Sequence, residues 1–146
     1  MDKTTWKCID ALYGNGTPPA QIIRSSSGDP ESEARIQAKF VTYLQKNNIL
    51  FYHVPNGGYR EKKEAYSLKL QGVQPGVPDI VIPIARKPYH GLYIELKRKS
   101  GGVTSSAQRW WLNELNLQGY AAFVAKGLEE AINLLLAYLE RPRWEQ

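Results

Sequence analysis

Apolar residues recur along the chain with two periods, one typical of helices and one typical of strands. Ile36, Phe40 and Leu44 recur every four residues, and this predicts a helix that is capped by Asp29 and starts at Pro30. Similar spacing predicts helices over 104–117 and 128–139, and a polar segment predicts a short helix over 62–70. Short runs rich in β-branched and apolar residues predict strands over 49–54, 80–84, 92–97 and 121–125.

The order of these elements predicts an α/β fold, a mixed β-sheet flanked by helices. The strands over 80–84 and 92–97 are separated by a short loop with Pro88 and Gly91, which suits an antiparallel hairpin. The helix over 104–117 separates the last two strands, and this strand–helix–strand order suits a parallel crossover. Residues 1–28 are rich in Gly, Pro and Ser and predict an irregular arm, and residues 29–146 predict a single domain.

Composition narrows the class of protein. With 42% hydrophobic and 23% charged residues among 146, the chain is typical of a globular domain. No apolar run approaches the roughly 20 residues of a membrane-spanning helix, and the polar amino terminus lacks the apolar core of a signal peptide. We therefore expect a cytoplasmic protein without membrane contact, and the single Cys8 cannot form an internal disulfide. The net charge of +5 favours a polyanionic partner without establishing one.

Three polar residues fall on the predicted strands, or just before one of them, where packing alone would not place them. Side chains alternate along a strand, so Glu95 and Lys97 lie on one face of the sheet, roughly 6–7 Å apart by strand rise. Asp79 opens the neighbouring strand, whose other residues are apolar. An ordinary surface salt bridge between Glu95 and Lys97 is the structural alternative, but Asp79 brings a second carboxylate to the same place.

Two carboxylates on adjacent strands form an oxygen-rich site that suits Mg²⁺ or Mn²⁺. Such a metal polarises a phosphodiester and lowers the pKa of a bound water, and Lys97 would orient that water or stabilise developing negative charge. Glu33 shares the inward stripe of its helix and would complete the metal site, although a first-turn glutamate also suits the helix dipole. Gln108 lies on the inward stripe of a later helix, where a catalytic role and a core amide bonded to backbone are equally good interpretations.

These residues resemble a known motif. Pro78-Asp79, fifteen intervening residues and Glu95-Leu96-Lys97 resemble the PD-(D/E)xK nuclease motif. The surrounding features resemble the stand-alone VRR-NUC (virus-type replication-repair nuclease) domains of phages and bacteria over about residues 31–139. These features are Glu33 with Gln37, Val54-Pro55-Asn56-Gly57, Gly76-Val77-Pro78-Asp79 and Gln108.

The resemblance implies a restriction-endonuclease-like core and Mg²⁺- or Mn²⁺-dependent hydrolysis of DNA, with a preference for Holliday junctions or flaps. It also implies a homodimer. Residue by residue, it implies metal binding by Glu33, Asp79 and Glu95, a catalytic lysine at Lys97 and a supporting role for Gln108.

Basic and polar residues in loops beside the predicted site are candidates for binding nucleic acid. Arg60 and Lys99 lie close to glycine pairs that let backbone approach a phosphate, and Asn56 lies at a strand end in the same region. A solvated charge cluster is the alternative for each. His53 is equally a candidate phosphate contact and a structural histidine.

Other functions of the same fold stay open at this point. A less selective DNase would have the same residues, since selectivity for branched DNA depends on geometry outside the motif. A catalytically silent DNA-binding module is disfavoured by the intact Asp79, Glu95 and Lys97. An RNA-binding or assembly protein whose carboxylates only form ion pairs ranks lowest.

Overall fold

A computed structural model describes residues 31–55 and 62–145. The predicted amino-terminal arm, residues 1–28, lies outside these ranges. The described residues form one mixed sheet in the order β1-β2-β3-β4. β2 (Ile80–Ile82) pairs antiparallel with β1 (Tyr52–His53) on one side and with β3 (Leu92–Lys97) on the other, and β4 (Ala121–Lys126) is parallel to β3. The predicted α/β class, the hairpin and the parallel crossover are confirmed.

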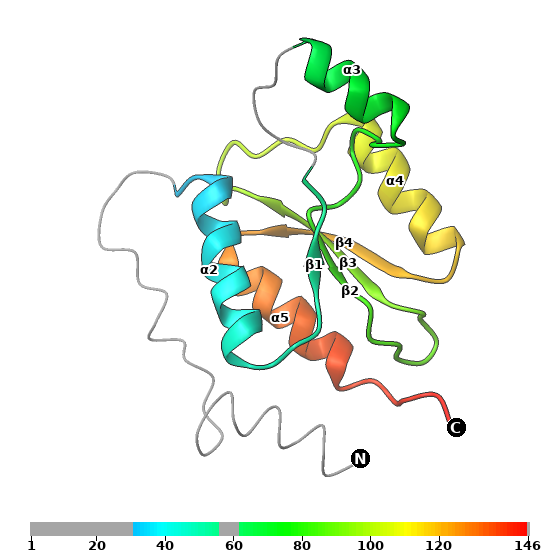
Figure 1. The fold of residues 1–146 in the computed structure, drawn as a ribbon. Helices are drawn as coiled ribbons and strands as arrows, with labels where there is room; N and C mark the ends of the chain where they lie inside the picture. The colour runs from blue at the N-terminus through cyan, green and yellow to red at the C-terminus, as the bar shows by residue number, and fades with distance from the viewer. Residues whose placement is uncertain (1–30, 56–61, 146) are drawn as a thin grey trace.

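Four described helices surround the sheet: α2 (Glu33–Lys46), α3 (Lys62–Leu70), α4 (Ser106–Leu117) and α5 (Leu128–Leu139). α2 and α5 pack together on one face of the sheet, α4 lies on the opposite side over β4, and α3 stands away from the sheet (Figure 1). None of the helices in the described ranges has the length and apolar character needed to cross a bilayer.

The hydrophobic core lies between the sheet and the α2–α5 pair. Along β3, Leu92, Ile94 and Leu96 point into this core and are at most 1% exposed. Ile36, Phe40 and Leu44 of α2 cover them, as the helical spacing predicts, and α5 contributes its whole apolar stripe. Because side chains alternate along a strand, Tyr93, Glu95 and Lys97 must project from the opposite face.

Several element boundaries differ from those predicted, each for a local reason. α2 begins at Glu33 rather than Pro30, because the Ser32 hydroxyl accepts a hydrogen bond from the Arg35 N–H and caps the helix there. β2 ends at Ile82 rather than at residue 84, because Pro83 has no N–H to donate to a ladder. β1 is limited to two residues, since it pairs only with the short β2. α4 begins at Ser106, after Ser105 and Gln108 form a capping box.

The predicted inward stripe of α4 is only partly correct. Within this helix Leu115 is buried and Ala107, Trp111 and Leu112 are half-buried, and all four lie outside the main core cluster. Trp111 instead turns its indole N–H toward the Pro75 carbonyl oxygen, at 3.1 Å. α4 is therefore fastened to the loop that precedes β2 as well as to the sheet.

The same loop packs against the start of α4 at Gly76. Gly76 has φ +86°, and a Cβ placed on it would lie 2.6 Å from the Ala107 carbonyl carbon and 2.8 Å from the Gln108 nitrogen. Both contacts are with backbone, which cannot swing aside. A glycine is therefore required here, both for its backbone conformation and for the close approach of two segments.

We expect Gly76→Ala to lower the free energy of unfolding much more than Gly72→Ala. Gly72 has a similar φ of +90°, but a Cβ placed on it would meet nothing within 4 Å, so it isolates the cost of the left-handed backbone. That cost is about 1–2 kcal/mol, and the clash at Gly76 should add about 1–3 kcal/mol. Urea unfolding of both variants measures the difference, and equal losses would show that the loop moves away from α4 without penalty.

Candidate active site

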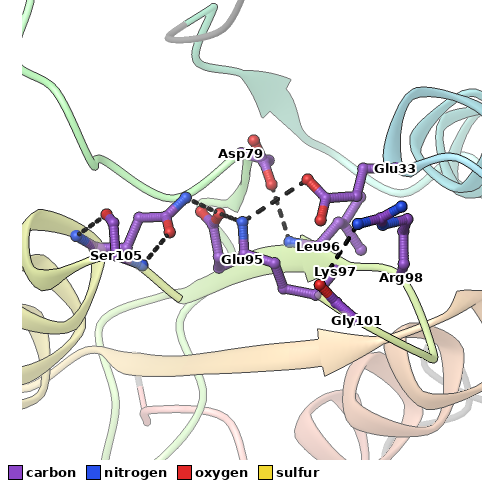
Figure 2. A network of polar contacts seen from close by, with 9 residues as sticks. Glu33, Asp79, Glu95, Leu96, Lys97, Arg98, Gly101 and Ser105 are labelled. Carbon is purple, nitrogen blue, oxygen red and sulfur yellow. Dashed lines mark hydrogen bonds and ion pairs between the residues drawn. The ribbon is translucent and has the colours of Figure 1, made fainter. Parts of the chain in front are cut away.

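The antiparallel register of β2 and β3 brings Asp79 opposite Glu95. Ile80 pairs with Ile94, so the residue before Ile80 comes opposite the residue after Ile94 on the same face of the sheet. The Asp79 backbone is held by β1, because its carbonyl oxygen accepts the Val54 N–H at 3.0 Å. The Asp79 carboxylate accepts the Leu96 N–H at 2.8 Å, beyond the end of the ladder (Figure 2). Asp79 and Glu95 thus face each other across the two strands, as predicted.

Glu95 is the most deeply buried acid of the site, at 1% exposure. Its Oε1 lies 2.9 Å from Lys97 Nζ and also accepts a hydrogen bond from the Gln108 side-chain amide. Its Oε2 is buried and has no hydrogen-bond partner among the described residues. An unsatisfied buried oxygen is costly in a native protein, and an ion bound there is one physical reason for it to persist.

The surroundings of Glu95 and Asp79 disfavour their charged forms. The pKa of Glu95 is raised to about 7, first by burial and then by the nearby charge of Asp79, while Lys97 acts in the opposite direction. Burial also raises the pKa of Asp79, although the Leu96 N–H and the charge of Lys97 lower it. Even with Lys97 beside them, nearby positive charge does not fully compensate the burial of the two carboxylates.

Lys97 lies between two carboxylates from different elements. Its Nζ is 2.9 Å from Glu95 Oε1 and 3.7 Å from Glu33 Oε2, and its side chain is 7% exposed. Burial alone would lower the pKa of Lys97, but the hydrogen bond and charge of Glu95, together with Glu33 and Asp79, raise it overall. Glu33 comes from the first turn of α2, as predicted, and Figure 2 shows it reaching toward Lys97.

Gln108 connects the start of α4 to the acids. Its Oε1 accepts the Ser105 N–H at 2.8 Å and its Nε2 donates to Glu95, so both ends of the amide are used. Features of both interpretations from the sequence are present, since the amide oxygen bonds to backbone and the amide nitrogen contacts Glu95, and a catalytic role for Gln108 stays a prediction. The S-x-x-Q spacing of Ser105 and Gln108 was a signal for this helix start that the periodicity over 104–117 obscured.

His53 supports Asp79 from β1. Its Nδ1 lies 2.8 Å from the Asp79 carbonyl oxygen and 3.1 Å from the Gln37 side-chain nitrogen. Only a pairing between distant segments places these groups together, so the sequence could not distinguish this role from a phosphate contact. In the structure His53 acts on the backbone that positions Asp79.

Of the three residues predicted to contact nucleic acid, the structure describes only Lys99. Asn56 and Arg60 lie outside the described residues. Lys99 is exposed, its Nζ lies 3.6 Å from Glu129 Oε2, and its aliphatic stem lies beside the Gly127 position. Its contact with phosphate stays a prediction.

Asp79 and Glu95 offer the carboxylate oxygens that Mg²⁺ and Mn²⁺ prefer, and the unpartnered Glu95 Oε2 fits a cation between them. Within the described ranges, however, no group of three or more His, Cys, Asp or Glu forms a ready-made metal site. Glu33 is joined to the other acids through Lys97, so its predicted place as a third metal ligand is not formed in this arrangement. The residues fit a metal held by Asp79 and Glu95.

Comparisons with known proteins agree with this geometry. The sequence model of the VRR-NUC domain family matches residues 31–129. A solved structure described as a VRR_NUC domain protein is similar to the chain with a TM-score of 0.70 and 28% sequence identity. The similarity covers 81% of this chain and 96% of that one. No curated protein matches the chain.

We expect Gln108→Glu to destabilise the protein more than Ser105→Ala in buffer without metal. A glutamate keeps an acceptor for the Ser105 N–H but replaces the amide donor by a negative charge beside Glu95. Loss of the Ser105 cap should cost about 1 kcal/mol, and the repulsion at Glu95 should cost about 1–3 kcal/mol. Urea unfolding measures both, and a Gln108→Glu variant as stable as wild type would show that the contact with Glu95 is unimportant.

Proposed function

Because the chain belongs to the VRR-NUC domain family and has a nuclease-type fold, we propose that it is a Mg²⁺- or Mn²⁺-dependent endonuclease that cuts branched or flapped DNA. The observation that carries the proposal is the buried Glu95 carboxylate, which faces Asp79 and Lys97 and has one oxygen without a partner among the described residues. If the carboxylates formed only an ion pair, there would be no physical reason to bury an oxygen that has no partner.

Each residue of the site has a different role in the proposed hydrolysis. Asp79 and Glu95 would hold the cation, and the Leu96 carbonyl faces the same side of β3 as the Leu96 N–H that Asp79 accepts. The bound cation supplies charge neutralisation and a water of lowered pKa. Lys97, held by Glu95 and Glu33, is placed to stabilise negative charge on the phosphate. Gln108 and His53 keep Glu95 and Asp79 in position.

Preference for branched DNA and action as a homodimer complete the proposal. Both are proposed from the likeness to stand-alone VRR-NUC domains, and the net charge of +5 supports an anionic partner. A less selective DNase is the second candidate, because the described active site would cut duplex or single strands by the same chemistry. Sedimentation of the free protein and of its junction complex tests the dimer.

Labelled four-way junction, flap, duplex and single-stranded DNA test the reaction, each with Mg²⁺, Mn²⁺ or EDTA. We expect cutting of the branched substrates with metal and none with EDTA. Asp79→Asn should lower kcat at least about a hundredfold, since several kcal/mol of charge stabilisation depend on the cation. Equal cutting of all substrates supports the less selective DNase, and binding without cutting in either metal supports a silent DNA-binding module.

Lys97 and Lys99 should differ in the step that they affect. Lys97→Met keeps the side-chain length but removes the charge, so kcat should fall about 10²- to 10³-fold while the Kd for DNA stays within a few-fold. Lys99→Met should weaken binding and reduce the salt dependence of Kd by about one unit of slope, with kcat retained. Single-turnover cleavage and binding titrations separate the two effects. A parallel fall of affinity and turnover in Lys97→Met would contradict its assigned role.

A further inference from the structure

A cavity of about 350 Å³ lies between the loop before β2 and helix α4. This volume is at the small end of the range of ligand sites, about 300–1,000 Å³, and suits one planar ring system better than an extended ligand. It is lined by Val54, Pro55, Gln71, Gly72, Val73, Gln74, Val77 and Trp111.

The cavity shares its walls with the active site. Val54 donates its N–H to the Asp79 carbonyl oxygen at 3.0 Å, and Val77 precedes Asp79 by two residues. On the other side, Trp111 lies one helical turn after Gln108, whose amide reaches Glu95. The loop that carries the cavity crosses close to the beginning of α4 (Figure 1), where Gly76 meets Ala107. The cavity therefore lies beside the segments that position Asp79 and Glu95.

The lining combines an aromatic ring, apolar side chains and amide edges. The Trp111 indole is fixed by its hydrogen bond to the Pro75 carbonyl and by an edge contact with Trp110, with ring centroids 5.2 Å apart. Three valines and Pro55 add apolar contact, and the side chains of Gln71 and Gln74 are exposed amides that can donate and accept. Among the lining residues that the structure describes there is no charged side chain, so a phosphate is not the ligand that this cavity suits.

We propose that this cavity binds an unpaired nucleobase of a nucleotide next to the scissile phosphate. A base has a flat apolar face for Trp111 and the valines, and a polar edge for the two glutamines. The inference rests on the proposed nuclease function and deepens it by naming what the site recognises. Bases in the single strand of a flap are already unpaired, so they enter the cavity without the free-energy cost of opening a duplex.

The test combines a change in the DNA with a change in the cavity. Flap substrates carry either a normal base or an abasic residue at each position around the cut, and the protein is wild type or Val73→Phe, which fills the cavity. With wild type, one abasic position should lower kcat/KM about tenfold, as expected for the loss of one stacked base. Val73→Phe should lower kcat/KM by a similar factor on the intact substrate and by less than about twofold on the abasic one.

Two tryptophan variants provide a matched control. Trp111→Ala should reproduce the loss on the intact substrate, whereas Trp144→Ala, which removes an exposed tryptophan that neither lines the cavity nor contacts Trp111, should cut both substrates as wild type does. Circular dichroism and urea unfolding of Val73→Phe and Trp111→Ala verify that the variants fold. Equal cutting of intact and abasic DNA by wild type, or additive losses in Val73→Phe, would overturn the inference.

A binding arm separates this inference from the proposed reaction. Affinities of intact and abasic flaps are measured in EDTA by fluorescence anisotropy for wild type and Val73→Phe. If no substrate is cut but wild type binds the intact flap about tenfold more tightly than the abasic one, and Val73→Phe abolishes the difference, the cavity binds a base and the catalytic proposal fails. Cutting with equal affinities and equal rates leaves the nuclease intact and overturns the cavity.

Discussion

The burial of the Glu95 carboxylate is the constraint on which the other features of the site depend. A charged group inside a protein must be paired, and among the described residues Glu95 is only half satisfied, by Lys97 and Gln108 on one oxygen. Its neighbour across the sheet, Asp79, adds a second negative charge rather than relieving the first. The site thus has a stability cost in the free protein, and a cation between the two acids would remove it. This is the sense in which the arrangement is suited to catalysis rather than to packing.

The core on the other face of the sheet offsets that cost and fixes the geometry. Ile80, Ile94 and Leu96 are all essentially buried against α2 and α5. β2 is apolar on both faces, but a slip by one residue would turn Asp79 away from Glu95 and toward the hydrophobic core, so the cost of burying that carboxylate opposes the slip. The same alternation that buries Ile94 and Leu96 projects Glu95 and Lys97 from the opposite face. The pairing of Asp79 with Glu95 is therefore a consequence of how the hydrophobic side is packed.

The sequence was informative where one element decides the outcome and uninformative where several must meet. Strand alternation predicted the span of β3 and the common face of Glu95 and Lys97, and apolar spacing predicted α5 from Leu128 to Leu139. The contact between His53 and the Asp79 carbonyl requires the pairing of β1 with β2, and no local pattern encodes it. The position of Lys97 between Glu33 and Glu95 depends on where α2 begins over the sheet. The proposed metal ligands and DNA contacts depend further on groups that the free protein does not include.

Helix α4 shows why the amphipathic pattern of a helix near a site is a poor guide to its packing. Gln108 and Trp111 lie on the stripe that periodicity assigns to the core, yet one contacts Glu95 and the other contacts the loop before β2. The start of the helix is held by the capping box of Ser105 and by the close approach of Gly76, so its first two turns are positioned by local contacts rather than by the core. A single rigid element thus positions a group beside the acids and a ring beside the neighbouring cavity. Any displacement of α4 would move both together, which couples the recognition of a base to the arrangement of Glu95.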